Sequence, residues 1–291
     1  MTVPASVLPP LDMPRRPAHA VPPGATDCHV HVFAPSDRIP FSPDRAYTPA
    51  PGIDPARLIR MHETIGISRA VLVASNVYAE DLRATEDALA AHPDRFRGVA
   101  LIRPDIADSE LDRLHRLGFR AVRINLVLPG ALRLEDLPVL APRLSDRGWH
   151  LEVQAKPETL AEVVGQFLAL PLDIAIDHLA LIRPEHGENH PGIAAVLRLL
   201  DGGRGWAKLS GPYVGEPGGP RFPRAAALAR RFAAAAPERC LWGSNFPHPQ
   251  AVPMPDDGDL IDWLAEAVPG AAARKRILVD NPARLFGFRS S

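Results

Sequence analysis

Two histidines that are separated by one residue lie near the start of the chain, within the run Thr26-Asp27-Cys28-His29-Val30-His31-Val32-Phe33. Side chains alternate along a strand, so His29 and His31 would point to the same face if this run forms a strand. Neighbouring imidazoles at a strand end can bind a metal ion, polarise a carbonyl or move a proton. Two half-buried histidines with a purely structural role would give the same pattern, so the pair alone does not decide between these uses.

The elements that must position these histidines follow a regular alternation of short apolar runs and amphipathic stretches of helical period. The runs that predict strands are residues 26–33, 69–75, 97–102, 119–126, 150–155, 173–178, 206–210 and 240–245. The stretches that predict helices lie near residues 55–65, 80–92, 108–117, 135–147, 158–169, 191–201, 222–236 and 258–268. Asp54 before the first helix, and Gly66 and Gly118 after the first and third, are suitable capping residues.

Eight strand–helix units in a chain of this length indicate an α/β protein, a single (β/α)8 TIM barrel. An open doubly wound sheet is the competing fold, but no glycine-rich phosphate loop follows the first strand. We expect a somewhat distorted barrel over residues 25–291, with a proline-rich extended arm or tail over residues 1–24. Residues 34–53 form a long loop after the first strand, of the kind that covers an active site.

Chemistry in such barrels sits at the carboxyl ends of the strands. The polar residues that end the predicted strands are His29, His31, Ser75, Asn76, Arg103, Arg123, Asn125, Gln154, Lys156, Asp177, His178, Ser210, Ser244, Asn245 and His248. On a regular strand Asp177 points away from the face that carries His178, so we expect Asp177 to be structural. The other residues would converge on one rim if the barrel prediction is right.

Composition excludes several classes of function. The chain has 33 basic and 34 acidic residues and a formal net charge of −1, so no basic stripe favours nucleic acid. It has no apolar run long enough to span a membrane. Two cysteines cannot form a disulfide framework, which favours a reducing cytoplasm. The oligomeric state is not predicted by any pattern.

The motifs together resemble the amidohydrolase superfamily, of the amidohydrolase 2 type. They are His29-Val-His31 on the first strand, Ile176-Asp177-His178 on the sixth, and Trp242-Gly-Ser-Asn-Phe-Pro-His248 on the eighth. Phe41-Ser-Pro43 with Tyr47, Arg123-Ile-Asn125 and Asn281-Pro-Ala-Arg-Leu285 are further matches. Within the superfamily, the chain is most similar to the branch of 2-pyrone-4,6-dicarboxylate lactonase, 4-sulfomuconolactone hydrolase, L-fuconolactonase and galactarolactone isomerase.

One position departs from the superfamily pattern. The superfamily places an aspartate on strand eight as metal ligand or general base, whereas this chain has Asn245. An amide does not take a proton from water near neutral pH, and its oxygen is a poorer ligand than a carboxylate. Three explanations remain open: a neutral His29 or His178 acts as the base, the reaction needs no activated water, or Asn245 is a deliberate replacement of an aspartate.

The resemblance implies a hydrolase that opens the ester bond of a small carboxylated lactone and that is metal-independent, or only weakly dependent on a metal ion. His29, His31 and His178 would donate hydrogen bonds to the lactone carbonyl as negative charge develops on its oxygen. Asn245 completes the catalytic set. We expect Asn76, Arg123, Gln154 and His248 to bind substrate or shape its pocket, with Arg123 binding a carboxylate.

The alternatives are a lactone isomerase that moves an acyl group within one molecule, a zinc enzyme, and a ligand-binding relative without turnover. The zinc reading places one ion on His29, His31 and His178 with a water in the open position.

Overall fold

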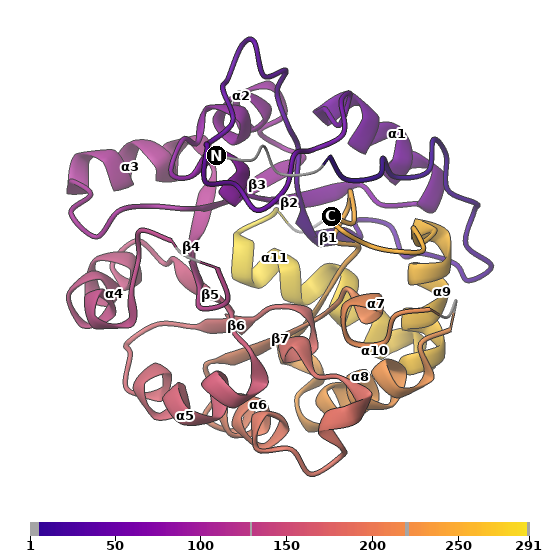
Figure 1. Cartoon of the computed structure of the whole chain (residues 1–291). Coiled ribbons are helices and arrows are strands. Elements are labelled where there is room, and N and C mark those ends of the chain that lie inside the picture. The colour runs from indigo at the N-terminus through magenta and orange to yellow at the C-terminus, as the bar shows by residue number, and fades with distance from the viewer. Residues whose placement is uncertain (1–5, 129, 219–220, 290–291) are drawn as a thin grey trace.

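The computed structural model describes residues 6–128, 130–218 and 221–289. Eight parallel strands follow one another in chain order around a barrel, and helices surround them (Figure 1). The strands are β1 (Thr26–Val30), β2 (Arg69–Val73), β3 (Phe96–Ala100), β4 (Phe119–Asn125), β5 (His150–Gln154), β6 (Ile174–Ile176), β7 (Gly205–Ser210) and β8 (Cys240–Gly243). All eight predicted strands are confirmed, most of them one to three residues shorter than expected.

The eight predicted helices are also present, within three residues at each end. They are α1 (Pro55–Ile65), α2 (Arg83–Ala91), α3 (Asp108–Leu117), α4 (Leu137–Ser145), α5 (Pro157–Leu168), α6 (Pro191–Asp201), α8 (Pro223–Ala235) and α9 (Asp257–Ala267). The predicted caps are confirmed: the Asp54 side chain accepts a hydrogen bond from the Arg57 backbone, and Gly66 and Gly118 have left-handed backbones. Sequence reasoning missed three short helices, α7 (Pro212–Gly215), α10 (Ala271–Lys275) and α11 (Asn281–Phe286).

The barrel closes between its last strand and its first. The backbone N–H of Asn245 donates to the carbonyl of His29 at 2.9 Å, and that of His31 donates to Phe246 at 2.8 Å. Asp27 supports the closure, because its Oδ1 accepts hydrogen bonds from the backbone of Ser244 and of His29. The residues that close the barrel are therefore the neighbours and backbones of the candidate catalytic residues.

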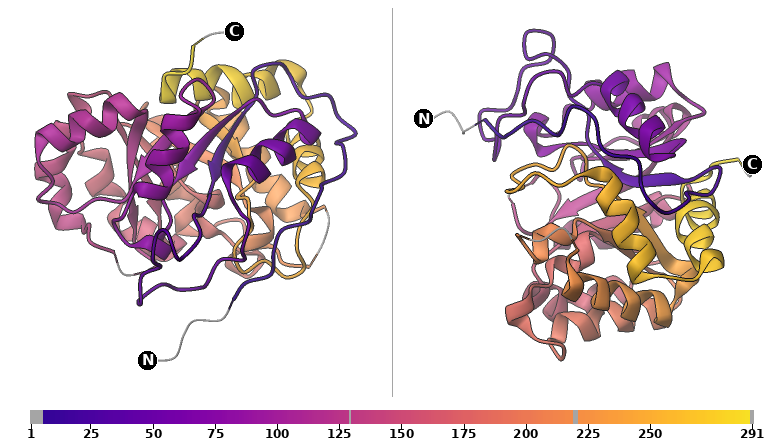
Figure 2. Two further views of the ribbon diagram at one scale, coloured as in Figure 1. Left: turned by 90° about the horizontal axis from the view of Figure 1, so that it is seen from above. Right: turned by 90° about the vertical axis from the view of Figure 1, so that its right-hand side faces the viewer.

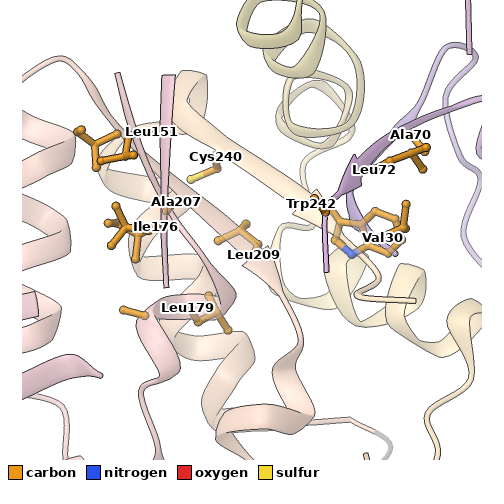
Figure 3. Close-up of a cluster of buried hydrophobic side chains, with 14 of the residues drawn as sticks. Val30, Ala70, Leu72, Leu151, Ile176, Leu179, Ala207, Leu209, Cys240 and Trp242 are labelled. Atoms are coloured by element: carbon orange, nitrogen blue, oxygen red, sulfur yellow. The ribbon is translucent and has the colours of Figure 1, made fainter. Parts of the chain in front are cut away.

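Two apolar clusters hold the barrel. The larger lies between strands and outer helices, and Figure 3 shows part of it, with Val30, Leu151, Leu209 and Trp242 fully buried. The smaller lies inside the barrel and includes Val71, Val99, Ala121, Ala175 and Leu241, together with Phe286 of α11 and Phe288. α11 crosses the middle of Figure 1 and lies at one end of the barrel in both views of Figure 2. Apolar side chains therefore fill the end of the barrel that lies next to α11.

The segment that precedes β1 lies against the loop after β1 and against α9. Val7 donates its backbone N–H to the carbonyl of Thr48, and Arg15 and His19 contact acidic residues of α9. The described start of the chain lies at the end of the barrel opposite α11 (Figure 2). The predicted boundary between an arm and a barrel at residue 24 stays a prediction, and residues 1–5 and 290–291 lie outside the described residues.

Among the helices that the structure describes, none combines the length and the apolar character needed to cross a bilayer.

Candidate active site

Three imidazoles meet where β1 and β6 end. The ring centroids of His29 and His31 are 5.2 Å apart, and those of His29 and His178 are 4.4 Å apart. His29 is fully buried, whereas His31 and His178 are each 5% exposed. Close packing holds His29, because a Cβ at Gly243 would lie 2.8 Å from the His29 Cβ. The structure thus brings together all three histidines that the sequence predicted to act as a group.

His31 has a defined protonation state. Its Nδ1 lies 2.7 Å from the carbonyl oxygen of Val73, which can only accept, so Nδ1 carries the proton and Nε2 has the free lone pair. Burial, and then the charge of Arg123, lower the pKa of His31 to about 4. At neutral pH His31 therefore presents an acceptor, rather than the donor that the sequence led us to expect.

The other two imidazoles are also neutral near pH 7. Burial lowers the pKa of His178 to about 3, against the opposing charge of Asp177, and lowers that of His29 well below its usual range. The Nδ1 of His178 lies 3.0 Å from the hydroxyl of Ser210, which can donate or accept. His29 Nε2 is buried without a hydrogen-bond partner among the described residues, so it is available to a ligand.

The expectation that Asp177 points away from the site is wrong. Its Oδ1 lies 3.4 Å from the Nδ1 of His29, and its Oδ2 accepts a hydrogen bond from the Nε of Arg123 at 2.9 Å. β6 ends at Ile176 and the backbone at His178 is left-handed, with φ 50°, so the alternation of a strand does not extend to this point. Burial alone would raise the pKa of the Asp177 carboxyl, but nearby cations hold it well below its usual value.

A buried ammonium lies beneath the histidines, and sequence reasoning missed it. Lys208 Nζ lies 2.6 Å from Glu152 Oε2, 3.3 Å from Asp177 Oδ1 and 3.2 Å from His29 Nδ1. Lys208 and Glu152 have no exposed surface. A signal was available, because Lys208 and Ser210 on β7, like Glu152 and Gln154 on β5, share one face of a strand in a buried run. A charge in the middle of such a run predicts a partner inside the barrel.

Arg123 is held by two partners and still faces a cavity. Besides Asp177, it donates from Nη2 to the Oε1 of Gln154 at 2.8 Å, and Gln154 also accepts from Asn125. Asn125 in turn caps the loop that follows β4. Arg123, Asn125 and the predicted Asn76 line one cavity of about 570 Å³. Gln154 is therefore a residue that positions Arg123, and it does not line this cavity.

Asn245 and His248 meet through a tyrosine that the sequence did not single out. The Nδ2 of Asn245 donates to the hydroxyl of Tyr213 at 2.9 Å, and that hydroxyl lies 3.0 Å from the Nδ1 of His248. The Nε2 of His248 lies 3.1 Å from Oδ1 of Asp257, the first residue of α9. Tyr213 lies on the short helix α7, and Asp257 is the first residue of α9. No periodic pattern in the sequence identifies such positions.

One group of side chains has the composition of a metal site. Ligand atoms of His29, Asp177 and His178 lie within 4.8 Å of one another. Arg123 and Lys208 already contact the carboxylate in this group, and Lys208 also contacts His29. A divalent ion bound here would lie beside two cations, so this donor set fits such an ion poorly.

Comparisons with known proteins agree with this geometry. The chain is 34% identical over 285 residues to a 2-pyrone-4,6-dicarboxylate hydrolase of Comamonas testosteroni, with 94% of this chain and 93% of the relative covered. It is 29% identical over 276 residues to a D-galactarolactone isomerase of Agrobacterium fabrum, with 93% of each covered. A crystal structure of an Agrobacterium tumefaciens protein in its apo form superposes with a TM-score of 0.86 at 28% identity, covering 94% of this chain and all of the other.

The family model described as amidohydrolase matches residues 26–288, which span β1 to the residues after α11. The histidines of β1, His178 after β6 and the segment after β8 all lie within that match. The chain belongs to the amidohydrolase family.

Proposed function

We propose that this protein is a hydrolase that opens the ester bond of a small lactone carrying one carboxylate, without a metal ion. The observation that carries the proposal is the meeting of His29, His31 and His178 with the guanidinium of Arg123 at the carboxyl end of the barrel. A relative that is 34% identical is named for hydrolysis of a pyrone dicarboxylate, which is a cyclic ester, and this name supports the reaction class.

His29 and His178 are suited to polarise the lactone carbonyl. An ammonium can only donate, so the contact of Lys208 with Nδ1 of His29 favours the tautomer that carries its proton on Nε2. The unpartnered Nε2–H of His29 would then donate to the carbonyl oxygen, and His178 would do the same when the Ser210 hydroxyl donates to its Nδ1. Each good donor to a developing oxyanion contributes roughly 10²–10³ in rate.

Arg123 is suited to bind the carboxylate of the substrate. Among the described residues that line the 570 Å³ cavity, Arg123 is the cation, whereas Asp44 and Glu80 are acidic. A second carboxylate on the substrate would therefore have no cationic partner there and would be repelled. This charge distribution favours a lactone with one carboxylate over a pyrone dicarboxylate.

The charges of Lys208 and Arg123 support catalysis without a metal. Two cations and two carboxylates, Glu152 and Asp177, already balance one another beneath the histidines. A zinc ion on the three imidazoles would add two positive charges to this buried region without adding an anion.

The test combines lactone hydrolysis with metal removal. We expect the purified protein to open a monocarboxylated lactone, to keep its rate after dialysis against a chelator, and to contain far less than one metal ion per chain by elemental analysis. His178→Ala is expected to lower kcat by about 10²–10³, whereas Arg123→Gln should mainly raise KM. Loss of activity on chelation with recovery on adding zinc would contradict the metal-free mechanism.

Isomerisation is a second candidate, and Asn245 is the observation that favours it. Transfer of an acyl group to a hydroxyl of the same lactone needs no water to be activated, and one relative is named as a galactarolactone isomerase. Nuclear magnetic resonance of a sugar-acid lactone distinguishes the two reactions: an isomerase gives a second lactone, and a hydrolase gives the open acid.

We also infer a reducing compartment, such as the cytoplasm, for this protein. Cys28 and Cys240 are buried free thiols, and burial raises the pKa of both well above the usual range. Both thiols are buried, and their raised pKa keeps them from forming the thiolate that disulfide formation requires.

A further inference from the structure

Hydrolysis requires a group that takes a proton from water, and Asn245 at the end of β8 is not one. We propose that Tyr213, His248 and Asp257 form a proton relay that supplies this base. The inference rests on the proposed hydrolysis, because it names the residues that would activate the water of that reaction.

The contacts form a continuous path from the site. Asn245 lies beside His29, because its backbone N–H donates to the carbonyl of His29. Its side chain donates to the Tyr213 hydroxyl at 2.9 Å, and that hydroxyl lies 3.0 Å from His248 Nδ1. On the other side of the ring, Nε2 of His248 lies 3.1 Å from Oδ1 of Asp257, a close approach that does not have the geometry of a hydrogen bond. This is the order of hydroxyl, imidazole and carboxylate found in activated nucleophile sites.

Two coupled proton transfers, through Tyr213 and His248, accompany the attack of water. An O–H bond of water breaks as the water oxygen bonds to the lactone carbonyl carbon, and the proton passes to the Tyr213 oxygen. The phenolic proton of Tyr213 moves at the same time to Nδ1 of His248, which becomes an imidazolium beside the Asp257 carboxylate. When the ring ester breaks, the proton returns by the same path to the leaving alkoxide.

The surroundings suit a neutral tyrosine that passes a proton on. Burial first, and then the carboxylates of Asp257 on α9 and Asp27 on β1, raise the pKa of Tyr213 well above its usual value. The phenol therefore stays protonated. Asp257 lies at the start of α9, where the helix dipole stabilises its negative charge.

A structural role alone accounts poorly for this network. His248 is fully buried and Asp257 is 3% exposed, and apolar residues at such positions would avoid the cost of burying a carboxylate and an imidazole. The backbone around the network is irregular, since Asn245 and His248 have left-handed φ values of 66° and 59°. Buried polar groups and left-handed backbone cluster together where a site requires them.

The experiment measures the pH dependence of kcat/KM for lactone opening in wild type and Tyr213→Phe. The wild-type profile should carry an acid limb, because the relay requires a base that can accept the proton of Tyr213. Tyr213→Phe should lower kcat by about 10²–10³, change KM by less than about threefold, and lose this acid limb. Asp257→Asn should lower kcat as well, and it serves as the second variant if Tyr213→Phe does not fold.

Rescue separates the relay from a structural role. In Tyr213→Phe/Asn245→Asp a carboxylate beside the site replaces the relay, so activity should return with an acid limb at lower pH. Tyr78→Phe is the matched control, because it removes a buried phenol whose hydrogen bonds, among the described residues, go to the backbone of Ala34, and its pH profile should equal that of wild type.

Each outcome has a definite reading. Full activity and an unchanged acid limb in Tyr213→Phe would overturn the relay and leave the proposed hydrolysis intact. Absence of hydrolysis by wild type on every lactone tested would overturn the hydrolysis and the relay together. Loss of activity in Tyr213→Phe that Asn245→Asp does not restore, in a folded protein, would make Tyr213 structural and would also overturn the relay.

Discussion

At the scale of single residues, the site is a set of buried charges whose energies depend on one another. Lys208 shows this most directly, because its ammonium lies between Glu152 and Asp177 and also contacts His29. All four side chains are buried, so no solvent screens their charges. Removing one partner of such a pair leaves the other as an uncompensated charge in the barrel.

We predict that Lys208→Met lowers the free energy of unfolding by about 3–5 kcal/mol. Lys208→Met/Glu152→Gln should be less destabilised, because one carboxylate is neutralised together with its partner. Chemical denaturation measures the free energy of unfolding of wild type, of Lys208→Met and of the double variant. Lys275→Met is the control, since its pair with Asp280 is exposed and should be worth less than about 1 kcal/mol. Equal losses in Lys208→Met and Lys275→Met would contradict the buried network.

The histidines predict how stability depends on pH. The pKa of His31 is lowered to about 4 and that of His178 to about 3, and that of His29 is also lowered. Between pH 6.5 and about 4 the unfolded chain therefore binds protons at these positions that the folded chain does not bind. Stability falls as the pH falls through this window, by roughly 1.4 kcal/mol per pH unit for each fully titrating imidazole.

Urea denaturation at several pH values between 7 and 4 measures this slope. His31→Asn should reduce the slope by the contribution of one imidazole. A wild-type stability that stays constant down to pH 4.5 would show that the three imidazoles titrate normally in the fold.

At the scale of elements, the periodic patterns located strands and helices well, and the irregular segments less well. The strand predicted at residues 173–178 extends two residues beyond the end of β6. Because of this error we expected Asp177 to point away from the site. The missed helices α7, α10 and α11 are each six residues or shorter, and they carry too few turns to give a 3.6-residue pattern. Tyr213 was missed for the same reason, because it lies on α7.

The segment before β1 makes contacts that no local pattern could predict. Asp262 of α9 accepts hydrogen bonds from Arg15 Nη2, from the backbones of Ala18 and His19, and contacts His19 Nδ1 at 2.8 Å. These partners are more than 240 residues apart in sequence. Asp262 thus makes the largest share of the contacts that Arg15, Ala18 and His19 form with α9, and Asp256 and Asp259 add further hydrogen bonds to Arg15.

Asp262→Ala should release this stretch. Loss of hydrogen bonds to a charged group costs about 1.5–3 kcal/mol, so we expect trypsin cleavage after Arg15 to be roughly ten to a hundred times faster. Mass spectrometry of the early fragments identifies the site. Glu266→Ala, at an exposed position on the same helix, is the control and should be cleaved at the wild-type rate. Equal rates in the two variants would show that other contacts hold the segment.

At the scale of the whole molecule, the count of strand–helix units was sufficient to predict the barrel and the end at which the candidate site residues gather. His29, His31, His178 and Arg123 followed from that placement, because parallel strands bring their carboxyl ends to one rim. The pairing of Lys208 with Glu152 and of His248 with Tyr213 did not follow. Those contacts depend on which inward positions of non-adjacent segments reach one another, and strand periodicity alone does not give that information.

The closure between β8 and β1 has a consequence for how the protein is made. Asp27 bonds to the backbone of Ser244, 217 positions later in the chain. At a synthesis rate of roughly 5–20 residues per second, β1 leaves the ribosome on the order of ten to forty seconds before its last partner exists. During that interval one edge of β1 lacks its neighbour, and an open strand edge invites pairing with other chains. A nascent chain therefore completes the candidate site only after residue 245 has been made, and a chain that stops before residue 245 has an open barrel and an incomplete site.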